Sequence, residues 1–445
     1  MSIKVIGAGL AGCEAAWQIA QAGVETELYE MKPKKYSPAH HSPNFAELIC
    51  SNSLKAERVE SAAGLLKEEM RRLGSLLMSC ADSCRVPAGG ALAVDRNAFS
   101  EAVTKKITEH PRIHIHHEEI QDIPKDGIVV IATGPLTADA LAEKIASLCG
   151  GSLSFFDAAA PIVTAESLAM DKIFAASRYG KGEDDAYLNC PMNKEEYERF
   201  YNALISAERA PLHEFDAADP KVYEGCMPVE VMAGRGPDTL RFGPLKPVGL
   251  RDPRTGHRPW AVVQLRREDK NGTLYNLVGF QTNLKFGEQK RVFGMIPGLE
   301  NAEFTRYGVM HRNTFLDSPK ILQSDYSLRA NPNLFFAGQI TGVEGYMESA
   351  SSGIMAGINA VRRLKGQNTL TLPQTTMIGS LSHYVANGGE ADFQPMGANF
   401  GVMPPLEPPV RDKKARYAAF SERALRDLEQ IIAAFGLSSN LEVLQ

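Results

Sequence analysis

The stretch Val5-Ile6-Gly7-Ala8-Gly9-Leu10-Ala11-Gly12 decides the fold of this 445-residue chain. Its glycines have the spacing G-x-G-x-x-G, and they follow a short apolar strand and open an Ala-rich helix, the context in which this motif is informative. Gly7 makes the tight turn, Gly9 lets the backbone approach a pyrophosphate, and Gly12 permits close helix packing. Because the helix N-terminus faces the phosphate charge, we expect residues 7–12 to bind a dinucleotide.

A second strand over residues 24–29 completes a βαβ unit and ends at Glu30. A carboxylate at this position accepts hydrogen bonds from the ribose hydroxyls of an adenosine. Further strands are expected at 113–117 and 128–132, and the latter runs into Thr133-Gly134, which we also assign to the cofactor. The sequence therefore predicts an α/β fold with a parallel, Rossmann-type sheet.

A second glycine turn lies near the other end of the sequence. The apolar strand 334–337 runs into Gly338-Gln339-Ile340-Thr341-Gly342-Val343-Glu344-Gly345-Tyr346, and a helix is expected over 351–364. Flavoproteins use such a turn for the ribityl chain and the flavin ring, and there is no second G-x-G-x-x-G for a nicotinamide domain. FAD is therefore the expected cofactor, held also by Gly338, Gln339, Gly342, Glu344, Gly345 and Tyr346.

The pattern between these two motifs indicates an inserted domain. Residues 158–300 carry most of the Pro and Arg, with hairpin signals such as Asn271-Gly272 between apolar runs. We expect a discontinuous FAD-binding domain, 1–157 and 301–445, around an α+β insertion at 158–300 that binds the substrate. Residues 411–435 have helical spacing and are expected to form a helix closing over the sheet.

Composition and cysteine usage indicate a cytoplasmic globular enzyme. Apolar residues make up 44% and charged residues 23% of the chain, and no apolar stretch approaches the roughly 20 residues needed to cross a bilayer. The first residues run straight into a strand and do not resemble a secretory leader. Seven cysteines without a C-x-x-C pair favour reduced thiols and argue against the disulfide reductases.

The net charge of −5 conceals a basic segment. Residues 241–291 contain eleven Lys and Arg against four Asp and Glu, with aromatic residues among them. Such a mixture binds phosphates and stacks on bases, and Arg266 and Arg267 are the expected contacts. A solvated basic face remains the simpler interpretation.

Two cysteines are candidates for chemistry. Cys226 lies in Gly225-Cys226-Met227-Pro228, where Gly and Pro indicate an exposed turn. Cys50 precedes an expected helix capped by Asn52 or Ser53, a position that stabilises a thiolate. From the local sequence alone, an inert thiol is the simpler interpretation of Cys226 and an equally good one of Cys50.

No metal site is expected from the remaining His and Cys residues. Cys80 and Cys84 have no second ligand pair nearby, and of His114, His116 and His117 only alternate residues share a strand face. His311-Arg312-Asn313 follows the insertion, where a hinge would face the substrate cleft, although a packing histidine is an equally good interpretation of His311.

These motifs resemble, from end to end, the bacterial family of folate- and FAD-dependent tRNA uracil-5-methyltransferases (TrmFO), which is related to the GidA flavoproteins. The similar stretches are Pro38–His41, Phe45–Leu54, Pro87–Arg96, Asp157–Val163, Glu224–Glu230, Gly308–Asn313 and Gly338–Tyr346. GidA-type chains look longer and carry an additional C-terminal domain.

The resemblance implies transfer of one carbon from 5,10-methylenetetrahydrofolate to C5 of the T-loop uridine of tRNA, with reduced FAD as reductant and NAD(P)H reducing the flavin. It implies Cys226 as the nucleophile at uracil C6, Cys50 as the base that removes the C5 proton, and His311 as a folate contact. No membrane and no obligate protein partner are expected.

Three rival functions remain open at this point. A GidA-like enzyme would modify the wobble uridine and need a protein partner. A generic FAD oxidoreductase would leave Cys226 and the basic segment unexplained. A non-catalytic flavin-containing tRNA chaperone would keep its function after loss of Cys226.

Overall fold

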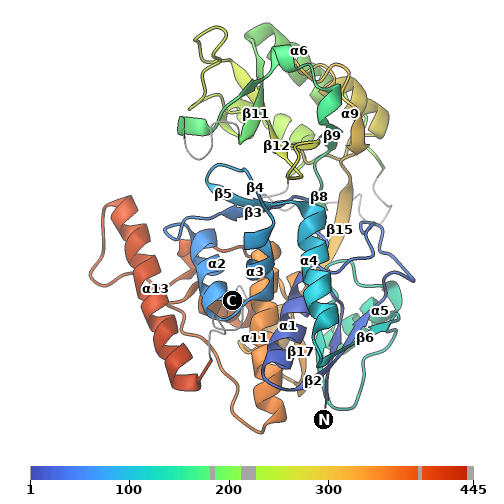
Figure 1. Ribbon diagram of the computed structural model, residues 1–445, viewed down its shortest axis with the longest axis vertical. Helices are drawn as coiled ribbons and strands as arrows, with labels where there is room; N and C mark the ends of the chain where they lie inside the picture. Colours follow the sequence, from blue (N-terminus) through green and yellow to red (C-terminus); the bar gives the residue numbers. More distant parts are fainter. Residues whose placement is uncertain (1, 152, 181–185, 212–226, 389–392, 438–445) are drawn as a thin grey trace.

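The computed structural model describes residues 2–151, 153–180, 186–211, 227–388 and 393–437. Two units lie one above the other, and the short strands β3, β4 and β5 lie at their junction (Figure 1). The lower unit is built from both ends of the sequence, and the upper unit comes from its middle. The two end segments of the chain therefore fold together, and the middle segment lies apart from them (Figure 1).

The lower unit is organised around a six-stranded sheet with the order β16-β17-β7-β1-β2-β6. All neighbours from β17 to β6 are parallel, and only β16 runs antiparallel at the edge. This confirms the predicted Rossmann-type sheet, in which a strand from beyond residue 330 completes a sheet begun at residue 2. The strands are β1 (Ser2–Ile6), β2 (Glu25–Glu30), β6 (Ile113–His117), β7 (Ile128–Ile131), β16 (Ser327–Leu328) and β17 (Asn331–Phe336).

Two helices that begin at the glycine turns pack directly on each other. They are α1 (Leu10–Gln21) and α11 (Tyr346–Leu364), and α11 begins five residues earlier than the sequence predicted. Gly353 and Gly357 of α11 face Ala11 and Ala15 of α1, where an added Cβ would lie 2.1 Å and 2.7 Å from the respective carbonyl oxygens. Only glycine allows this close approach, which fixes the two turns relative to one another.

The remaining helices of the lower unit cover the sheet and its flank. They are α2 (Ala62–Arg72), α3 (Leu76–Ser83), α4 (Arg96–Glu109), α5 (Asp139–Cys149), α10 (Ser318–Ile321), α12 (Met377–Asn387) and α13 (Lys413–Phe435). The expected C-terminal helix is therefore present, and it lies alongside α2 at the edge of the molecule (Figure 1). Within the described ranges, no helix is both long and apolar enough to cross a membrane.

The upper unit has its own six-stranded sheet and its own core. Its strand order is β10-β11-β12-β13-β9-β14, and every pairing in it is antiparallel. The strands are β9 (Ile162–Thr164), β10 (Phe174–Ala175), β11 (Tyr187–Met192), β12 (Ala261–Arg267), β13 (Leu274–Leu277) and β14 (Phe304–Arg306). The helices are α6 (Lys194–Ser206), α7 (Val229–Ala233), α8 (Thr239–Phe242) and α9 (Phe286–Phe293).

A two-stranded antiparallel ribbon leads into and out of the upper unit. It consists of β8 (Leu153–Ala158) and β15 (Met310–Phe315). A three-stranded sheet, β3 (Ser53–Ala56), β5 (Ala91–Val94) and β4 (Arg85–Val86), lies beneath the upper unit. The predicted helix after Cys50 is therefore wrong: residues 53–56 form a strand because they pair with β5.

Candidate functional site

One elongated cleft runs along the carboxyl edge of the lower sheet. Two adjoining hollows form it, one reaching Glu30 and the other reaching Cys50 and the start of α11. They share six lining residues, Gly9, His40, Glu47, Ala132, Thr133 and Leu136. The two glycine turns predicted from the sequence therefore meet in a single cleft, as expected for ligands of parallel α/β sheets.

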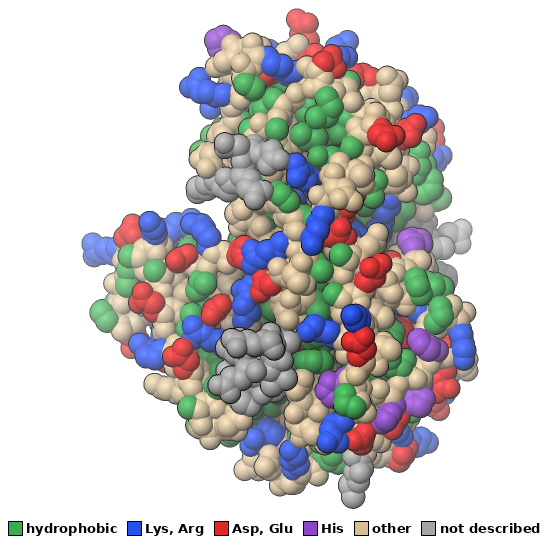
Figure 2. All heavy atoms as spheres, in the orientation of Figure 1, with side chains coloured by type: hydrophobic (Ala, Val, Ile, Leu, Met, Phe, Trp, Pro, Cys, Tyr) green, Lys and Arg blue, Asp and Glu red, His purple; other side chains and the backbone are tan. Residues whose placement is uncertain are grey.

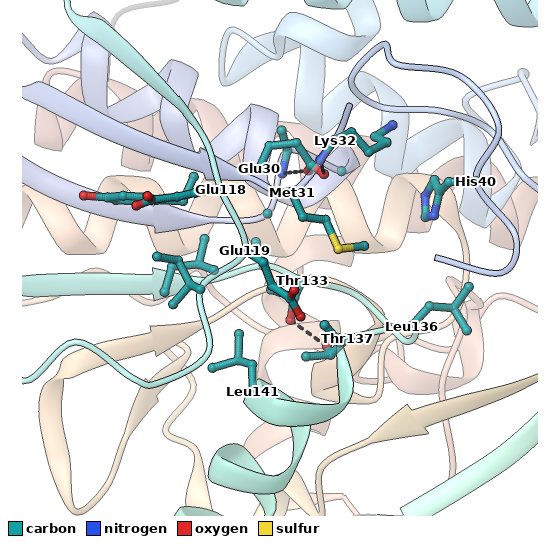
Figure 3. Close-up of a pocket in the computed structure, with 18 of the residues that line it drawn as sticks. Glu30, Met31, Lys32, His40, Glu118, Glu119, Thr133, Leu136, Thr137 and Leu141 are labelled. Carbon is teal, nitrogen blue, oxygen red and sulfur yellow. Dashed lines mark hydrogen bonds between the residues drawn. The ribbon is translucent and has the colours of Figure 1, made fainter. Parts of the chain in front are cut away.

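Glu30 closes one end of the cleft. Its carboxylate accepts hydrogen bonds from the backbone N–H of Ala8 (2.8 Å) and of Lys32 (3.0 Å). In Figure 3, Glu30 lies on one side of this hollow and Thr133 and Thr137 on the other, with Met31 extending between them. A carboxylate has about four acceptor positions, so two remain for the vicinal hydroxyls of a ribose.

The middle of the cleft is built for a charged ligand that approaches the backbone. Gly9 is the N-cap of α1, no side chain caps this helix, and a Cβ at Gly9 would meet nothing within 4 Å. On the facing strand end, Gly134 has φ +71° and is equally open. Uncapped helix N–H groups beside open space form a site for an anion such as a pyrophosphate.

The second glycine turn shapes the other end. Gly338, Gly342 and Gly345 have φ of 89°, 83° and 122°, a region that L side chains rarely adopt. The Gln339 amide donates to the Glu344 carboxylate over 2.6 Å, which stiffens the turn. Gly338, Gln339, Glu344, Gly345 and Tyr346 line the cleft, whereas Gly342 packs against Phe393.

The structure adds two charged residues that the sequence analysis missed. Glu348, in the first turn of α11, is buried, and its carboxylate accepts from Lys55 Nζ (2.7 Å) and from the N–H of Ala398 (3.0 Å). Lys55 itself has φ +65°, in a bulged part of β3. Both line the cleft near Cys50. Neither belongs to a recognisable motif, so no sequence signal pointed to them.

Cys50 lies at this same end, against the first residue of α11. The Tyr346 hydroxyl lies 3.0 Å from Cys50 Sγ and accepts from the N–H groups of Cys50 (2.8 Å) and Ser51 (3.2 Å). Burial, followed by the neighbouring Cys50, holds the pKa of Tyr346 well above its usual value. The cysteine expected to act as a base is therefore next to the expected cofactor site, although not at a helix N-terminus.

Cys226 lies outside the described residues, so the structure does not test its position. The residues that follow it are anchored beside the cleft: the N–H of Val229 donates to the carbonyl of Gln281 over 2.7 Å, and Gln281 lines the cleft. Glu230 is buried and accepts from Thr282 Oγ1 (2.8 Å) and from the N–H of Asn283 (2.7 Å).

The segment 311–313 lies in β15, which pairs with β8 in the ribbon between the two units. Asn313 is buried and lines the cleft near Cys50. The side chains of His311 and Arg312 lie outside the described part of the structure, so their expected contact with substrate stays a prediction.

Arg266 is not on an open cationic surface, and the expectation that it contacts tRNA phosphates is wrong. It is 6% exposed, and its guanidinium donates to Asn52 Oδ1 and Ser51 Oγ, both over 2.8 Å. The Asn52 amide in turn donates to the carbonyl of Arg267 over 2.8 Å. Because Ser51 and Asn52 directly follow Cys50, the side chain of Arg266 and the backbone of Arg267 connect the upper unit to the Cys50 loop. The expected contact of the Arg267 side chain with tRNA stays a prediction.

Part of the basic segment is neutralised by ion pairs, two of which involve acids outside residues 241–291. Four of its cations pair with acids, as Arg241–Asp238, Arg254–Asp252, Lys285–Glu208 and Arg291–Glu288. Lys246, Arg251 and Arg258 stay exposed and have no acidic partner in the described part of the chain. Phe242, on the same unit, is 81% exposed.

His114 and His116 each contact a carboxylate of the neighbouring strand, Glu25 and Glu27 respectively. Within the ranges that the structure covers, no group of three His, Cys, Asp or Glu side chains is placed to hold a metal ion.

Comparisons with known proteins give one consistent result. The family model described as "Glucose inhibited division protein A" matches residues 2–368. A protein of Desulfitobacterium hafniense named "Methylenetetrahydrofolate--tRNA-(uracil-5-)-methyltransferase TrmFO" is 62% identical over 98% of this chain and 99% of its own. A protein of the same name from Acetivibrio thermocellus is 59% identical over 97% of this chain and 99% of its own.

The fold is shared with solved structures of lower identity. Two crystal forms of Aquifex aeolicus GidA superpose with TM-scores of 0.70 and 0.71 at 16% identity. They cover 98% of this chain and 73% and 76% of the respective GidA chains, so about a quarter of GidA lies outside the superposition.

Proposed function

Since this chain belongs to the TrmFO family within the group described as glucose inhibited division protein A, we propose that it methylates C5 of the T-loop uridine of tRNA. The one-carbon donor is 5,10-methylenetetrahydrofolate, and reduced FAD is the reductant, itself reduced by NAD(P)H. The observation that carries the proposal is the single cleft that joins a dinucleotide site to Cys50.

The residues present fit FAD. Glu30 retains free acceptor positions for the adenosine ribose, and the uncapped start of α1 beside Gly9 and Gly134 suits the pyrophosphate. The cleft then continues to the second glycine turn, where the lining includes Ile49, Leu54 and Leu66, apolar side chains that suit a planar ring. A nicotinamide dinucleotide alone would leave this second turn without a ligand.

When bound, the flavin supplies electrons for reduction of the one-carbon unit taken from the folate. The chain's own residues activate the uracil. Cys226 adds through its sulfur to C6, which makes C5 carbanion-like and able to accept carbon. Cys50 then accepts the C5 proton, and C5=C6 re-forms as the bond between C6 and Cys226 sulfur breaks. His311 is assigned to the folate.

Two groups of exposed cations support tRNA as the substrate. One contains Lys246, Arg251 and Arg258 on the upper unit, and the other contains Arg411, Lys413 and Lys414, just before and at the start of α13. Cations at a helix N-terminus oppose the helix dipole, and of the second group only Lys413 has a ring contact within the described residues, with Tyr417 at 5.6 Å. Figure 2 shows a hollow between the upper unit and the lobe at the left. The upper edge of that lobe carries Lys and Arg side chains.

A charge-reversal experiment tests this surface. Lys413→Glu with Lys414→Glu weakens tRNA binding and lowers the slope of log K against log salt by about 1 for each lost phosphate contact. Lys105→Glu on α4 is the control, because Lys105 is equally exposed and lies on a different helix. An unchanged slope in the double variant would remove these residues from the interface.

The experiment that tests the function incubates the enzyme with unmodified tRNA transcript, methylenetetrahydrofolate and NADPH, and measures 5-methyluridine by nucleoside mass spectrometry. A folate-dependent methyl group in the T-loop is the expected result. Modification at the anticodon would instead favour the GidA-like alternative. Cys226→Ala separates the enzyme from a flavin-containing chaperone, since it abolishes covalent trapping on tRNA with 5-fluorouridine while tRNA binding persists.

A further inference from the structure

The Tyr346 hydroxyl makes three polar contacts with the Cys50 loop. Two come from backbone N–H groups, those of Cys50 (2.8 Å) and Ser51 (3.2 Å), and the third is Cys50 Sγ at 3.0 Å. Tyr346 is the first residue of α11, so its ring position is fixed by the helix that packs on α1.

The number of protons and lone pairs on the Tyr346 oxygen decides which atom donates in its contact with Cys50 Sγ. A phenol oxygen has two lone pairs and one proton, and the two N–H groups, which can only donate, occupy both lone pairs. The hydroxyl proton is then left for Sγ, which must act as the acceptor. If the thiol donated instead, one oxygen would accept three hydrogen bonds and its own proton would have no partner among the described residues.

A hydroxyl that donates to sulfur favours the thiolate over the thiol, because charge-assisted hydrogen bonds are about twice as strong as neutral ones. The tyrosine itself stays protonated, since burial and the nearby Cys50 raise its pKa. The donor therefore remains in place when Cys50 is negatively charged.

Among the described residues, two cations near Cys50 act in the same direction. The guanidinium of Arg96 is half-buried and donates to the carbonyls of Leu48 and Ile49, the two residues before Cys50. Arg306 on β14 is a second cation whose charge acts on Cys50 and Tyr346. Glu268 opposes them but is ion-paired with Arg96 over 3.0 Å.

We propose that Tyr346 is a positioning residue that holds Cys50 as the proton acceptor for the C5 proton of the uracil. The proposal rests on the proposed function. In the step, the C5–H bond breaks, the proton moves to Cys50 Sγ, and its electron pair forms C5=C6 as the Cys226 S–C6 bond breaks. Addition of Cys226 to C6 does not involve Tyr346.

Tyr346→Phe removes the donor and keeps the ring. The rate of Cys50 alkylation by iodoacetamide, followed by peptide mass spectrometry against pH, needs no substrate and no turnover. We expect the midpoint of this profile to move up by at least about one pH unit, which corresponds to about tenfold less thiolate at pH 7. Tyr187→Phe is the control, since its hydroxyl donates to the carbonyl of Ala88 over 3.1 Å, away from Cys50.

Tritium release from tRNA with [5-³H]uridine reports the proton transfer itself. In Tyr346→Phe it falls about tenfold at pH 7 and recovers toward wild type near pH 9, while trapping on 5-fluorouridine tRNA persists because C5 of that base carries no proton. Both readouts are normalised to FAD content, measured by absorbance, because Tyr346 also lines the cofactor cleft.

Two outcomes would overturn the proposal: an unchanged alkylation profile, or a loss of tritium release that is equal at every pH. Failure of the proposed function is a separate result, because wild type would then release no tritium although the alkylation profile still shifts.

Discussion

Replacing Gly353 with alanine tests whether the close packing of α1 on α11 holds the two halves of the cleft together. The added Cβ would lie 2.1 Å from the carbonyl oxygen of Ala11. Ordinary contact begins at about 3.4 Å, and the opposing atom belongs to the backbone of a buried helix, so the helices must separate by roughly 1 Å. Overpacking of this kind costs about 3 kcal/mol.

With an unfolding entropy of about 2.1 cal/mol/K per residue and a cooperative unit of roughly 300 residues, this cost lowers Tm by about 5 °C. Differential scanning fluorimetry measures the shift, and bound flavin is quantified by absorbance. Gly287→Ala in α9 is the matched control, because a Cβ there meets nothing within 4 Å, and alanine is favoured by up to about 1 kcal/mol in a helix. If Gly353→Ala is as stable as Gly287→Ala and binds flavin fully, the argument from close packing is wrong.

Two further predictions concern carboxylates of the lower unit. Glu30→Gln weakens FAD binding about 10- to 100-fold, because the amide NH2 cannot accept a hydrogen bond and the acceptor positions left for the ribose hydroxyls are lost. Titration of the apoprotein with FAD measures the affinity, and equal affinity would exclude Glu30 from the site. Glu69 accepts from the N–H groups of Met377 (2.7 Å) and Ile378 (2.8 Å), and burial raises its pKa to about 8. The folded state therefore holds a proton that the unfolded chain releases near pH 4.5, so this group makes stability fall as pH rises from about 4.5 to 8. Glu69→Gln lowers stability at pH 5 but flattens this slope in thermal melts between pH 5 and 8; an unchanged slope would show that Glu69 does not titrate there.

The elements that decide the fold were predictable because their signals are local. Gly7, Gly9 and Gly12 lie in one turn between a strand and a helix, and the apolar run at β7 has no polar position, as expected for a strand buried on both faces. β17 and α11 were also predicted, because an apolar strand followed by a glycine-rich turn and a helix occurs a second time in the sequence.

The predictions that failed depend on contacts between residues far apart in the sequence. Residues 53–56 pair with β5 and form a strand, which no property of Asn52 or Ser53 reveals. Arg266 was counted as a surface cation because its charge is visible in the sequence, whereas its acceptors Asn52 and Ser51 lie more than 200 residues away. Lys55 and Glu348 were missed for the same reason, because only their ion pair, which joins distant parts of the sequence, shows that both lie at the cleft.

The order β17-β7-β1 in the lower sheet has a consequence for synthesis on the ribosome. β7 ends at Ile131, and its outer edge receives β17 only after Phe336 has emerged. At about 5–20 residues per second, the roughly 200 intervening residues leave an apolar strand edge without its neighbour for about 10–40 s. An open edge of this kind recruits other chains. The middle of the chain has its own core and is translated within this interval, so it can fold before the lower sheet is complete.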